Sequence, residues 1–208
     1  MAYSDFTLNK AKQTFGLTTD AETDLFAEVR EVVISDFLQM QLERRAPLGE
    51  ALGTEKARSE FIIAPLLAEA RDLLHRRVSL FSGRDFNVAP EQGLKGVCDF
   101  IFARSPEQFD LTAPVLMVVE AKKEDLTSGL GQCVAEMVAA RLFNEREGIP
   151  ITTIYGAVTS GSDWKFLKLA GSCVFIDKRQ YYLAEAAKIL SILTTILQEE
   201  ESAQAQVA

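Results

Sequence analysis

Cysteine is scarce in this chain of 208 residues, which contains only three, Cys98, Cys133 and Cys173. They lie far apart, are odd in number and do not form a CxxC spacing, so neither a disulfide framework nor a zinc site is indicated. The sequence therefore predicts reduced thiols in a cytoplasmic protein.

Long hydrophobic runs and an excess of positive charge are also missing. No run approaches the roughly 20 apolar residues that cross a bilayer, and the first residues, MAYSDFTLNKAKQ, lack the apolar core of a signal peptide. We therefore expect no membrane partner. The formal net charge of −8 counts against a broad basic surface for nucleic acid, although it is compatible with a local basic groove.

The composition is otherwise that of a soluble globular protein, with 48% hydrophobic and 25% charged residues. A chain of this length can bury a sizeable core, and no linker or internal repeat divides it, so we expect one domain over residues 1–208. Residues 1–19 are polar and are expected to form a loose N-terminal arm or a short strand. Residues 199–208 are small and acidic, and are expected to form a disordered tail.

The spacing of apolar residues predicts the order of helices and strands. Helices are expected over 20–46, 54–76, 128–144 and 183–198, and strands over 78–81, 85–88, 97–102, 115–121, 151–159, 164–169 and 173–177. The strand, helix and strand between residues 115 and 159 indicate a crossover connection. The fold class is therefore expected to be α/β, close to the α+β boundary, with a central mixed sheet flanked by helices.

The segment VLMVVEAKKED, residues 115–125, places charged residues at the end of an apolar strand. Side chains alternate along a strand, so Glu120 and Lys122 point to the same side. Asp99 interrupts another apolar strand, VCDFIF, where a branched residue would suit the strand better. If the two strands are neighbours, two carboxylates and one ammonium converge on one spot.

A third acid is found in the expected second helix. Glu60 is spaced by three, four and seven residues from Ile63, Ala64 and Leu67, which predicts that it lies on the apolar side. An acid buried there needs a partner such as a cation, a metal or a water. Carboxylates near a lysine suit magnesium, which takes oxygen ligands and usually one or two carboxylates.

The ordered set resembles the PD-(D/E)XK nuclease superfamily, also called restriction-endonuclease-like. The shared elements are Glu60 in SEFIIAPLL, Asp99 in GVCDFI, Glu120 and Lys122 in VVEAK, and Gln132 in GLGQCVAEM. The resemblance covers about residues 55 to 170. One departure is that Cys98, rather than a proline, precedes the first acid of the strand pair.

The resemblance implies a hydrolase, a nuclease dependent on Mg²⁺ or Mn²⁺ with a restriction-endonuclease-like core. Asp99 and Glu120 would bind the metal with the main-chain oxygen of Ala121, and Glu60 would complete the site directly or through water. Lys122 would position or activate the attacking water, and Gln132 would support the lysine or touch the substrate. The expected partner is nucleic acid, DNA in preference to RNA. Because the net charge is negative and would repel a polyanion, a homo-oligomer whose second subunit aids binding is also possible.

Other interpretations of the same residues stay open. Glu120 and Lys122 can form a purely structural ion pair, and Asp99 can bond backbone amides. Glu60 can be a helix-surface residue if Pro65 shifts the helix phase, and Gln132 can be structural or solvent-facing. The domain can be nuclease-like but inactive, binding nucleic acid or protein, or it can be an interaction domain with no site. A dinucleotide loop in GLGQCV is disfavoured, because Val134 occupies the place of the third glycine.

Overall fold

The computed structural model describes residues 1–198, and the tail 199–208, expected to be disordered, lies outside the described residues. Within the described part, eight strands form one mixed sheet. The strands are β1 (Thr18–Asp20), β2 (Ser79–Asp85), β3 (Val97–Ala103), β4 (Val115–Ala121), β5 (Thr153–Thr159), β6 (Asp163–Ala170), β7 (Cys173–Ile176) and β8 (Tyr181–Tyr182). In place of the two strands expected over 78–81 and 85–88, the structure has a single strand, β2, that ends at Asp85, and residues 86–88 lie outside it.

The sheet has the order β1-β7-β6-β5-β4-β3-β2, and β8 pairs with β6. β4 and β5 are parallel, as are β1 and β7, whereas the remaining pairs are antiparallel. The long helix α5 (Leu126–Arg146) connects the parallel strands β4 and β5, which confirms the expected crossover. The expected α/β class with a mixed sheet flanked by helices is therefore confirmed.

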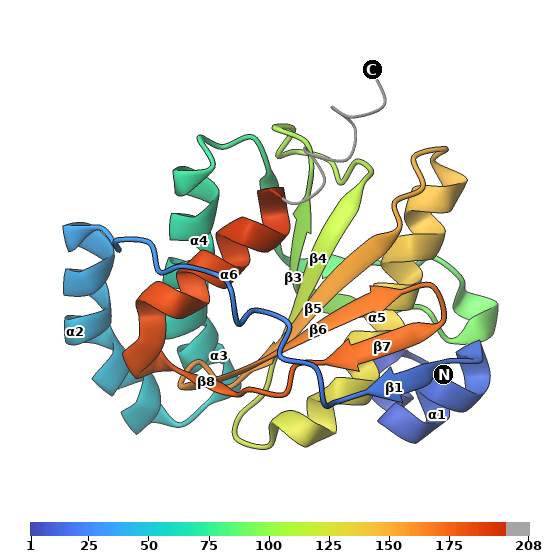
Figure 1. The fold of residues 1–208 in the computed structure, drawn as a ribbon, viewed down its shortest axis with the longest axis horizontal. Coiled ribbons are helices and arrows are strands. Elements are labelled where there is room, and N and C mark those ends of the chain that lie inside the picture. Colours follow the sequence, from blue (N-terminus) through green and yellow to red (C-terminus); the bar gives the residue numbers. More distant parts are fainter. Residues whose placement is uncertain (199–208) are drawn as a thin grey trace.

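Helices cover both faces of the sheet (Figure 1). Besides α5, the α-helices are α1 (Leu8–Phe15), α2 (Asp36–Leu52), α3 (Glu55–Arg58), α4 (Ala64–Leu73) and α6 (Ala186–Gln198). A π-helical turn lies at Ser59–Ile63, and short 3-10 turns lie at Tyr3–Asp5, Pro90–Gln92 and Leu183–Glu185. Helices α1 and α5 lie on one side of the sheet, and α2, α3, α4 and α6 lie on the other. In the described part of the chain, no helix combines the length and apolar character needed to cross a membrane.

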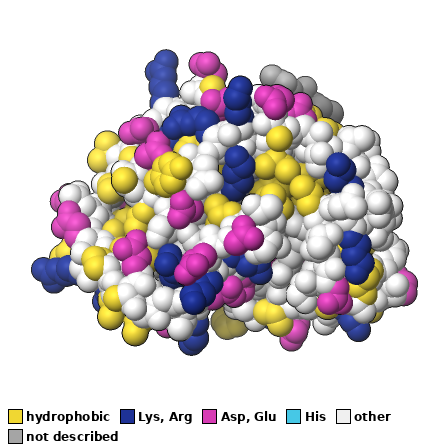
Figure 2. Space-filling view, turned by 90° about the horizontal axis from the view of Figure 1, so that it is seen from below, with side chains coloured by type: hydrophobic (Ala, Val, Ile, Leu, Met, Phe, Trp, Pro, Cys, Tyr) yellow, Lys and Arg dark blue, Asp and Glu magenta, His cyan; other side chains and the backbone are white. Residues whose placement is uncertain are grey.

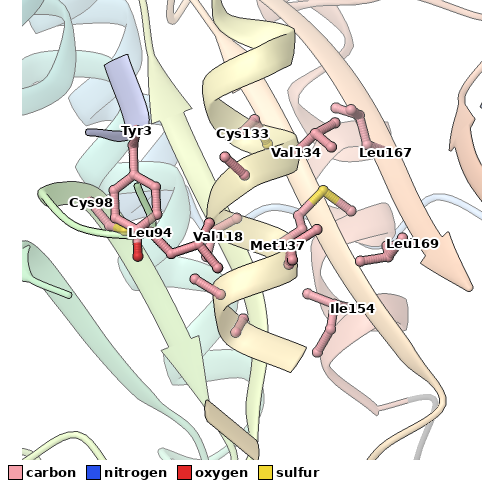
Figure 3. Packing of buried hydrophobic residues seen from close by; sticks show 14 of the residues in the cluster. Tyr3, Leu94, Cys98, Val118, Cys133, Val134, Met137, Ile154, Leu167 and Leu169 are labelled. Carbon is pink, nitrogen blue, oxygen red and sulfur yellow. The ribbon is translucent and has the colours of Figure 1, made fainter. Parts of the chain in front are cut away.

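Helix α5 packs closely on the centre of the sheet. Its residues Cys133, Val134 and Met137 are buried together with Val118 and Leu167 of the strands (Figure 3). The contact requires a glycine below the helix: a Cβ at position 156 of β5 would lie 2.6 Å from the sulfur of Met137 and 2.7 Å from that of Cys133. The site residues carried by α5 and β4 are thus held by a tightly packed core.

The opposite face of the sheet has its own buried cluster. Phe100, Met117 and Val119 of the strands pack there against residues of α4 and α6, such as Leu67 and Ile189. The sheet therefore lies between two apolar layers, and strands β3 and β4 are covered on both sides.

The N-terminal segment is not the loose arm that its polar sequence suggests. Tyr3 and Phe6 are 1% and 2% exposed, and the Tyr3 hydroxyl donates a 2.7 Å hydrogen bond to the main-chain oxygen of Phe86. Figure 3 shows the Tyr3 ring beside Leu94 and Cys98. Residues 18–20 also pair with β7. Contacts with residues far along the chain therefore hold this segment in place.

The helix expected over 20–46 is wrong in its first half. The carboxylate of Asp20 accepts hydrogen bonds from the backbone of Glu22 and Thr23, which forms a local turn instead of a helix cap. The apolar residues that follow pack in a non-helical segment, and helix α2 begins only after Ser35, whose hydroxyl caps Leu38 at 3.1 Å. It continues through Pro47, which removes a single backbone donor, and ends at Leu52 before a left-handed glycine.

The second helical region begins where expected. Thr54 caps α3 by accepting a 3.1 Å hydrogen bond from the main-chain nitrogen of Ala57. The π-helical turn Ser59–Ile63 then interrupts the regular pitch, and Pro65 follows in the first turn of α4. The turn changes which side chains share a face, because its hydrogen bonds span five residues instead of four.

Candidate active site

Two acids meet where β3 begins and the neighbouring strand β4 ends. The antiparallel register pairs Phe100 with Val119, and its extension by one residue places Asp99 opposite Glu120. Oδ2 of Asp99 accepts a 2.7 Å hydrogen bond from the main-chain nitrogen of Ala121. The carboxylate of Asp99 is thereby fixed to the end of β4.

Lys122 lies directly against Glu120. Its Nζ is 2.5 Å from Oε1 of Glu120, and the two side chains are 21% and 2% exposed. The main-chain nitrogen of Lys122 donates to the oxygen of Thr159 on β5, which continues the strand pairing past the end of β4. This extended backbone explains why residues 120 and 122 point to the same side, as their spacing predicts.

Helix α5 adds two polar side chains to this cluster. Oε1 of Gln132 accepts a 3.2 Å hydrogen bond from Nζ of Lys122, and its Nε2 donates a 3.1 Å bond to Oε1 of Glu136. Glu136 is fully buried. The sequence interpretation missed it, although a signal existed: CVAEMVAA contains one acid among apolar residues, four residues after Gln132.

The two glycines of GLGQCV have a packing role. A Cβ at Gly129 would lie 2.6 Å from Cγ1 of Val158 and 3.0 Å from Cγ of Lys122. A Cβ at Gly131 would overlap the backbone around Thr7, just before α1. The glycines therefore allow the start of α5 to approach Lys122 and the N-terminal segment, which accounts for them without a dinucleotide.

The expected placement of Glu60 on the apolar side of its helix is wrong. Its side chain is 52% exposed and pairs with Lys56 at 2.7 Å. Within residues 1–198, Glu60 takes no part in the hydrogen-bonded cluster around Lys122. The physical reason is the π-helical turn, which begins at Ser59 and shifts the faces that regular helical spacing assumes.

Glu55, five residues earlier, lies near the cluster instead. It lines a cavity of about 220 Å³ with Lys56, Ser59, Ser82, Gly83, Asp99 and Phe100. Burial raises the pKa of Glu55, the positive charge of Lys122 opposes this rise, and the negative charge of Asp99 adds to it. Glu55 therefore shares the electrostatic environment that the sequence interpretation assigned to Glu60.

Ionising the acids of this cluster is unfavourable, and their pKa values are raised. Burial raises the pKa of Asp99, against the lowering effect of the Ala121 amide and Lys122. Burial and the adjacent Asp99 raise the pKa of Glu120 from 4.5 to about 8. Burial and Glu120 also raise the pKa of Glu136 well above its ordinary value. The site thus concentrates more negative charge than its surroundings readily accommodate.

Lys122 only partly compensates for this charge. Burial disfavours its ammonium form, but Glu120, Glu55 and Asp99 together outweigh burial and raise the pKa of Lys122. Oε2 of Glu120 and Oε2 of Glu136 are buried, and no donor among residues 1–198 bonds to them. Ionised carboxylates are acceptors alone, so each of these oxygens needs a proton, a donor or a cation to be satisfied.

The donor set fits a hard divalent cation. Asp99 and Glu120 supply two carboxylates, the Ala121 carbonyl belongs to the same strand end, and Oε2 of Glu120 lacks a donor. Magnesium commonly uses only one or two carboxylates and takes its other oxygens from water and substrate. Among residues 1–198, no group of three or more His, Cys, Asp or Glu side chains is arranged to hold a metal. A cation here would therefore be incompletely enclosed by protein.

The surroundings of the site carry charges of both signs. The loop after β4 lies at the lower edge of Figure 1, and Figure 2 shows the molecule from that side. Acidic and basic side chains are interspersed on this face, with hydrophobic side chains between them. Arg84 of β2 is opposite Cys98 of β3, and its guanidinium pairs with the carboxylate of Asp110 at 2.9 Å.

The structure thus brings together Asp99, Glu120, Ala121, Lys122 and Gln132, and it adds Glu55 and Glu136 to them. The chemical roles of these residues stay predictions. No protein-family model matches the chain, and neither the curated proteins nor the solved structures compared with it give a match.

Proposed function

We propose that the protein is a metal-dependent nuclease that hydrolyses phosphodiester bonds in nucleic acid. The observation that carries this proposal is the half-buried pairing of Asp99 with the end of β4, beside a glutamate and a lysine that point the same way. Buried acids with raised pKa values at a cavity are typical of functional sites. The resemblance to PD-(D/E)XK nucleases supports the proposal and is part of it.

Asp99, Glu120 and the carbonyl of Ala121 would hold Mg²⁺ or Mn²⁺. When bound, the cation would offset charge on the phosphate and make a coordinated water more acidic. Its positive charge would also relieve the repulsion between the half-buried carboxylate of Asp99 and the buried carboxylate of Glu120. Glu55 takes the place proposed for Glu60, at the wall of the cavity next to Asp99.

Lys122 would act on the substrate through its ammonium group. Its three hydrogens can donate to Glu120, to Gln132 and to one further acceptor, and the first two bonds are present. The third can be directed to the attacking water or to a phosphate oxygen, where it would stabilise developing negative charge. Gln132 would keep the ammonium in place.

The substrate is proposed to be DNA rather than RNA, and the location cytoplasmic, in keeping with three free thiols. The mixed charges in Figure 2 and the Arg84–Asp110 pair indicate weak, salt-sensitive attraction of a polyanion. A homo-oligomer would add basic residues from a second subunit. These are parts of the proposal.

One observation favours a second candidate, an inactive nuclease-like domain that binds nucleic acid or protein. The ammonium of Lys122 already pairs with Glu120, so part of the cluster is neutralised without a metal. The two candidates differ in turnover, since only a nuclease cleaves.

The test is cleavage of plasmid and of single-stranded DNA, with Mg²⁺, with Mn²⁺ and with a chelator. We expect cleavage only with metal, and its loss in Lys122→Met with the folded state retained. Binding of DNA without cleavage in either metal would support the inactive domain. Absence of both DNA binding and cleavage would contradict the nuclease and the form of the inactive domain that binds nucleic acid, and would leave only a domain that binds protein.

A further inference from the structure

Glu136 is a buried acid that the proposed mechanism does not use. It lies in the middle of α5, fully buried among apolar neighbours such as Cys133 and Met137. Its Oε2 accepts no hydrogen bond from the part of the chain that the structure describes. Replacing a buried charged group with an apolar side chain of similar size is often neutral or stabilising, so packing alone does not explain an acid here.

The contacts of Glu136 lead to Lys122 through one residue. Oε1 of Glu136 accepts from Nε2 of Gln132 at 3.1 Å, and Oε1 of Gln132 accepts from Nζ of Lys122 at 3.2 Å. An ammonium only donates, so the Gln132 amide must turn its oxygen toward Lys122 and its NH₂ group toward Glu136. A carboxyl group can accept this bond whether or not it carries a proton.

The spacing of these residues supports the same link. Gln132 and Glu136 are four residues apart, so they lie one above the other on the helix. Without an acceptor at position 136, the Gln132 amide could rotate and present its NH₂ group to the ammonium, which would repel it. Gly129 places the same helix against the methylene groups of Lys122, so the lysine is confined along its length.

We propose that Glu136 is a positioning residue, which orients the Gln132 amide and thereby holds the Lys122 ammonium beside Glu120. The inference rests on the proposed function, because a nuclease needs this ammonium in one place relative to the phosphate. Glu136 itself does not touch the substrate. Its effect on catalysis passes through Gln132.

The first experiment measures the position of Lys122 without any activity. Acetylation of Lys122 by an N-hydroxysuccinimide ester is followed by mass spectrometry, with the adjacent, exposed Lys123 as the internal reference. Loss of one hydrogen bond in Glu136→Met should accelerate Lys122 relative to Lys123 by roughly fivefold. Glu136→Gln, which keeps an acceptor oxygen, should stay near the wild-type ratio. An unchanged ratio in Glu136→Met would overturn the proposal.

Folding is checked in the same samples, because the thiols of Cys98 and Cys133 are buried and react with iodoacetamide only after opening. If Glu136→Met exposes these thiols, Gln132→Met tests whether the link protects Lys122 at all, since it removes the bond to Lys122 and leaves Glu136 in place. We expect accelerated acetylation of Lys122 in Gln132→Met, and no further acceleration in the double variant where that variant folds. A protected Lys122 in Gln132→Met would overturn the proposal.

Kinetics separate this inference from the proposed function. If the wild-type protein cleaves DNA, Glu136→Met should lower kcat by about tenfold with KM nearly unchanged, and Glu136→Gln should retain most of kcat. A loss of kcat in both variants alike would contradict positioning through an acceptor oxygen. If the wild-type protein cleaves nothing, the proposed function fails, whereas the acetylation ratios still decide whether Glu136 positions Lys122.

Discussion

Oδ2 of Asp99 on β3 accepts a 2.7 Å hydrogen bond from the main-chain nitrogen of Ala121 on β4. One side chain therefore has two tasks: it satisfies a backbone donor at the strand end, and it presents negative charge beside Glu120. An asparagine can accept the same hydrogen bond with its amide oxygen but carries no charge. The two tasks can be separated by substitution.

Asp99→Asn should therefore retain or raise the stability of the metal-free protein, whereas Asp99→Ala should lower it by about 1–3 kcal/mol through the unsatisfied amide. Both variants should lose metal binding. Wild-type protein with Mn²⁺ at about 100 times its dissociation constant should melt roughly 5–10 °C higher than without metal. Thermal unfolding with Mn²⁺ and with a chelator measures both effects. A full metal-induced shift in Asp99→Asn would contradict a metal at this carboxylate.

Glu55 and Glu60 provide a matched pair on one helical region. Glu55 lines the cavity beside Asp99, and Glu60 pairs with Lys56 in solvent. Glu55→Gln should weaken the Mn²⁺-induced rise in Tm and the cleavage rate, whereas Glu60→Gln should leave both close to wild type, since exposed ion pairs contribute little. If Glu60→Gln reduced the metal-induced rise in Tm and the cleavage rate as much as Glu55→Gln does, or more, Glu60 would be restored as the site residue.

The Glu55 and Glu60 pair also illustrates which parts of the site follow from sequence. Glu120 and Lys122 share a side because strand side chains alternate, a local rule that needs no knowledge of partners. The helix glutamate was misplaced because a π-helical turn, which depends on tertiary packing, changes the facing residues. Glu136 was accessible in principle, as an acid in an apolar helix. Its link to Lys122 through Gln132 requires the position of α5 on the sheet.

The same distinction holds for the fold. The crossover from β4 through α5 to β5 was predictable, because strong local patterns mark each element. The order of the N-terminal segment was not, since its strand pairs with β7 and its Tyr3 reaches Phe86, both far along the chain. Contacts of this kind leave no periodic signal in a short polar segment.

This difference predicts a large effect of an N-terminal substitution. Phe6 is 2% exposed and packs against Phe15 with ring centroids 5.3 Å apart. Phe6→Ala should lower the free energy of unfolding by about 3–5 kcal/mol. The exposed Ser4→Ala serves as the control and should change it little. Chemical denaturation of both variants would show whether this segment is part of the cooperative core, and equal stabilities would contradict it.

Gly129 should be intolerant of even one added carbon. A Cβ there would lie 2.6 Å from Val158 and 3.0 Å from Lys122, so Gly129→Ala should cost about 1–3 kcal/mol of stability through overpacking. It should also displace Lys122 and lower the cleavage rate. Thr127→Ala, at an exposed position near the start of the same helix, introduces the same residue without this contact. Similar unfolding curves for the two variants would show that α5 can move away from Lys122.

The buried acids predict an unusual dependence of stability on pH in the absence of metal. In the folded protein, burial and the adjacent Asp99 raise the pKa of Glu120 to about 8, above the ordinary value of 4.5 that applies to the unfolded chain. Between these values the folded state binds more protons, so the free energy of unfolding should fall as pH rises, by up to about 1.4 kcal/mol per pH unit for each such group. The raised pKa values of Asp99 and Glu136 act in the same direction, and Lys122 titrates above this range.

Glu120→Gln removes one of these titrating groups and should make the pH dependence less steep. Urea unfolding between about pH 5 and pH 8, in the presence of a chelator, compares the two slopes. Added Mn²⁺ should flatten the wild-type curve as well, because a cation favours the ionised carboxylates, and it should have little effect on Glu120→Gln. If the free energy of unfolding of the wild-type protein instead rises steadily with pH across this range, the protein's own groups stabilise the ionised carboxylates of the cluster. The carboxylates would then not repel each other in a way that a bound metal would relieve.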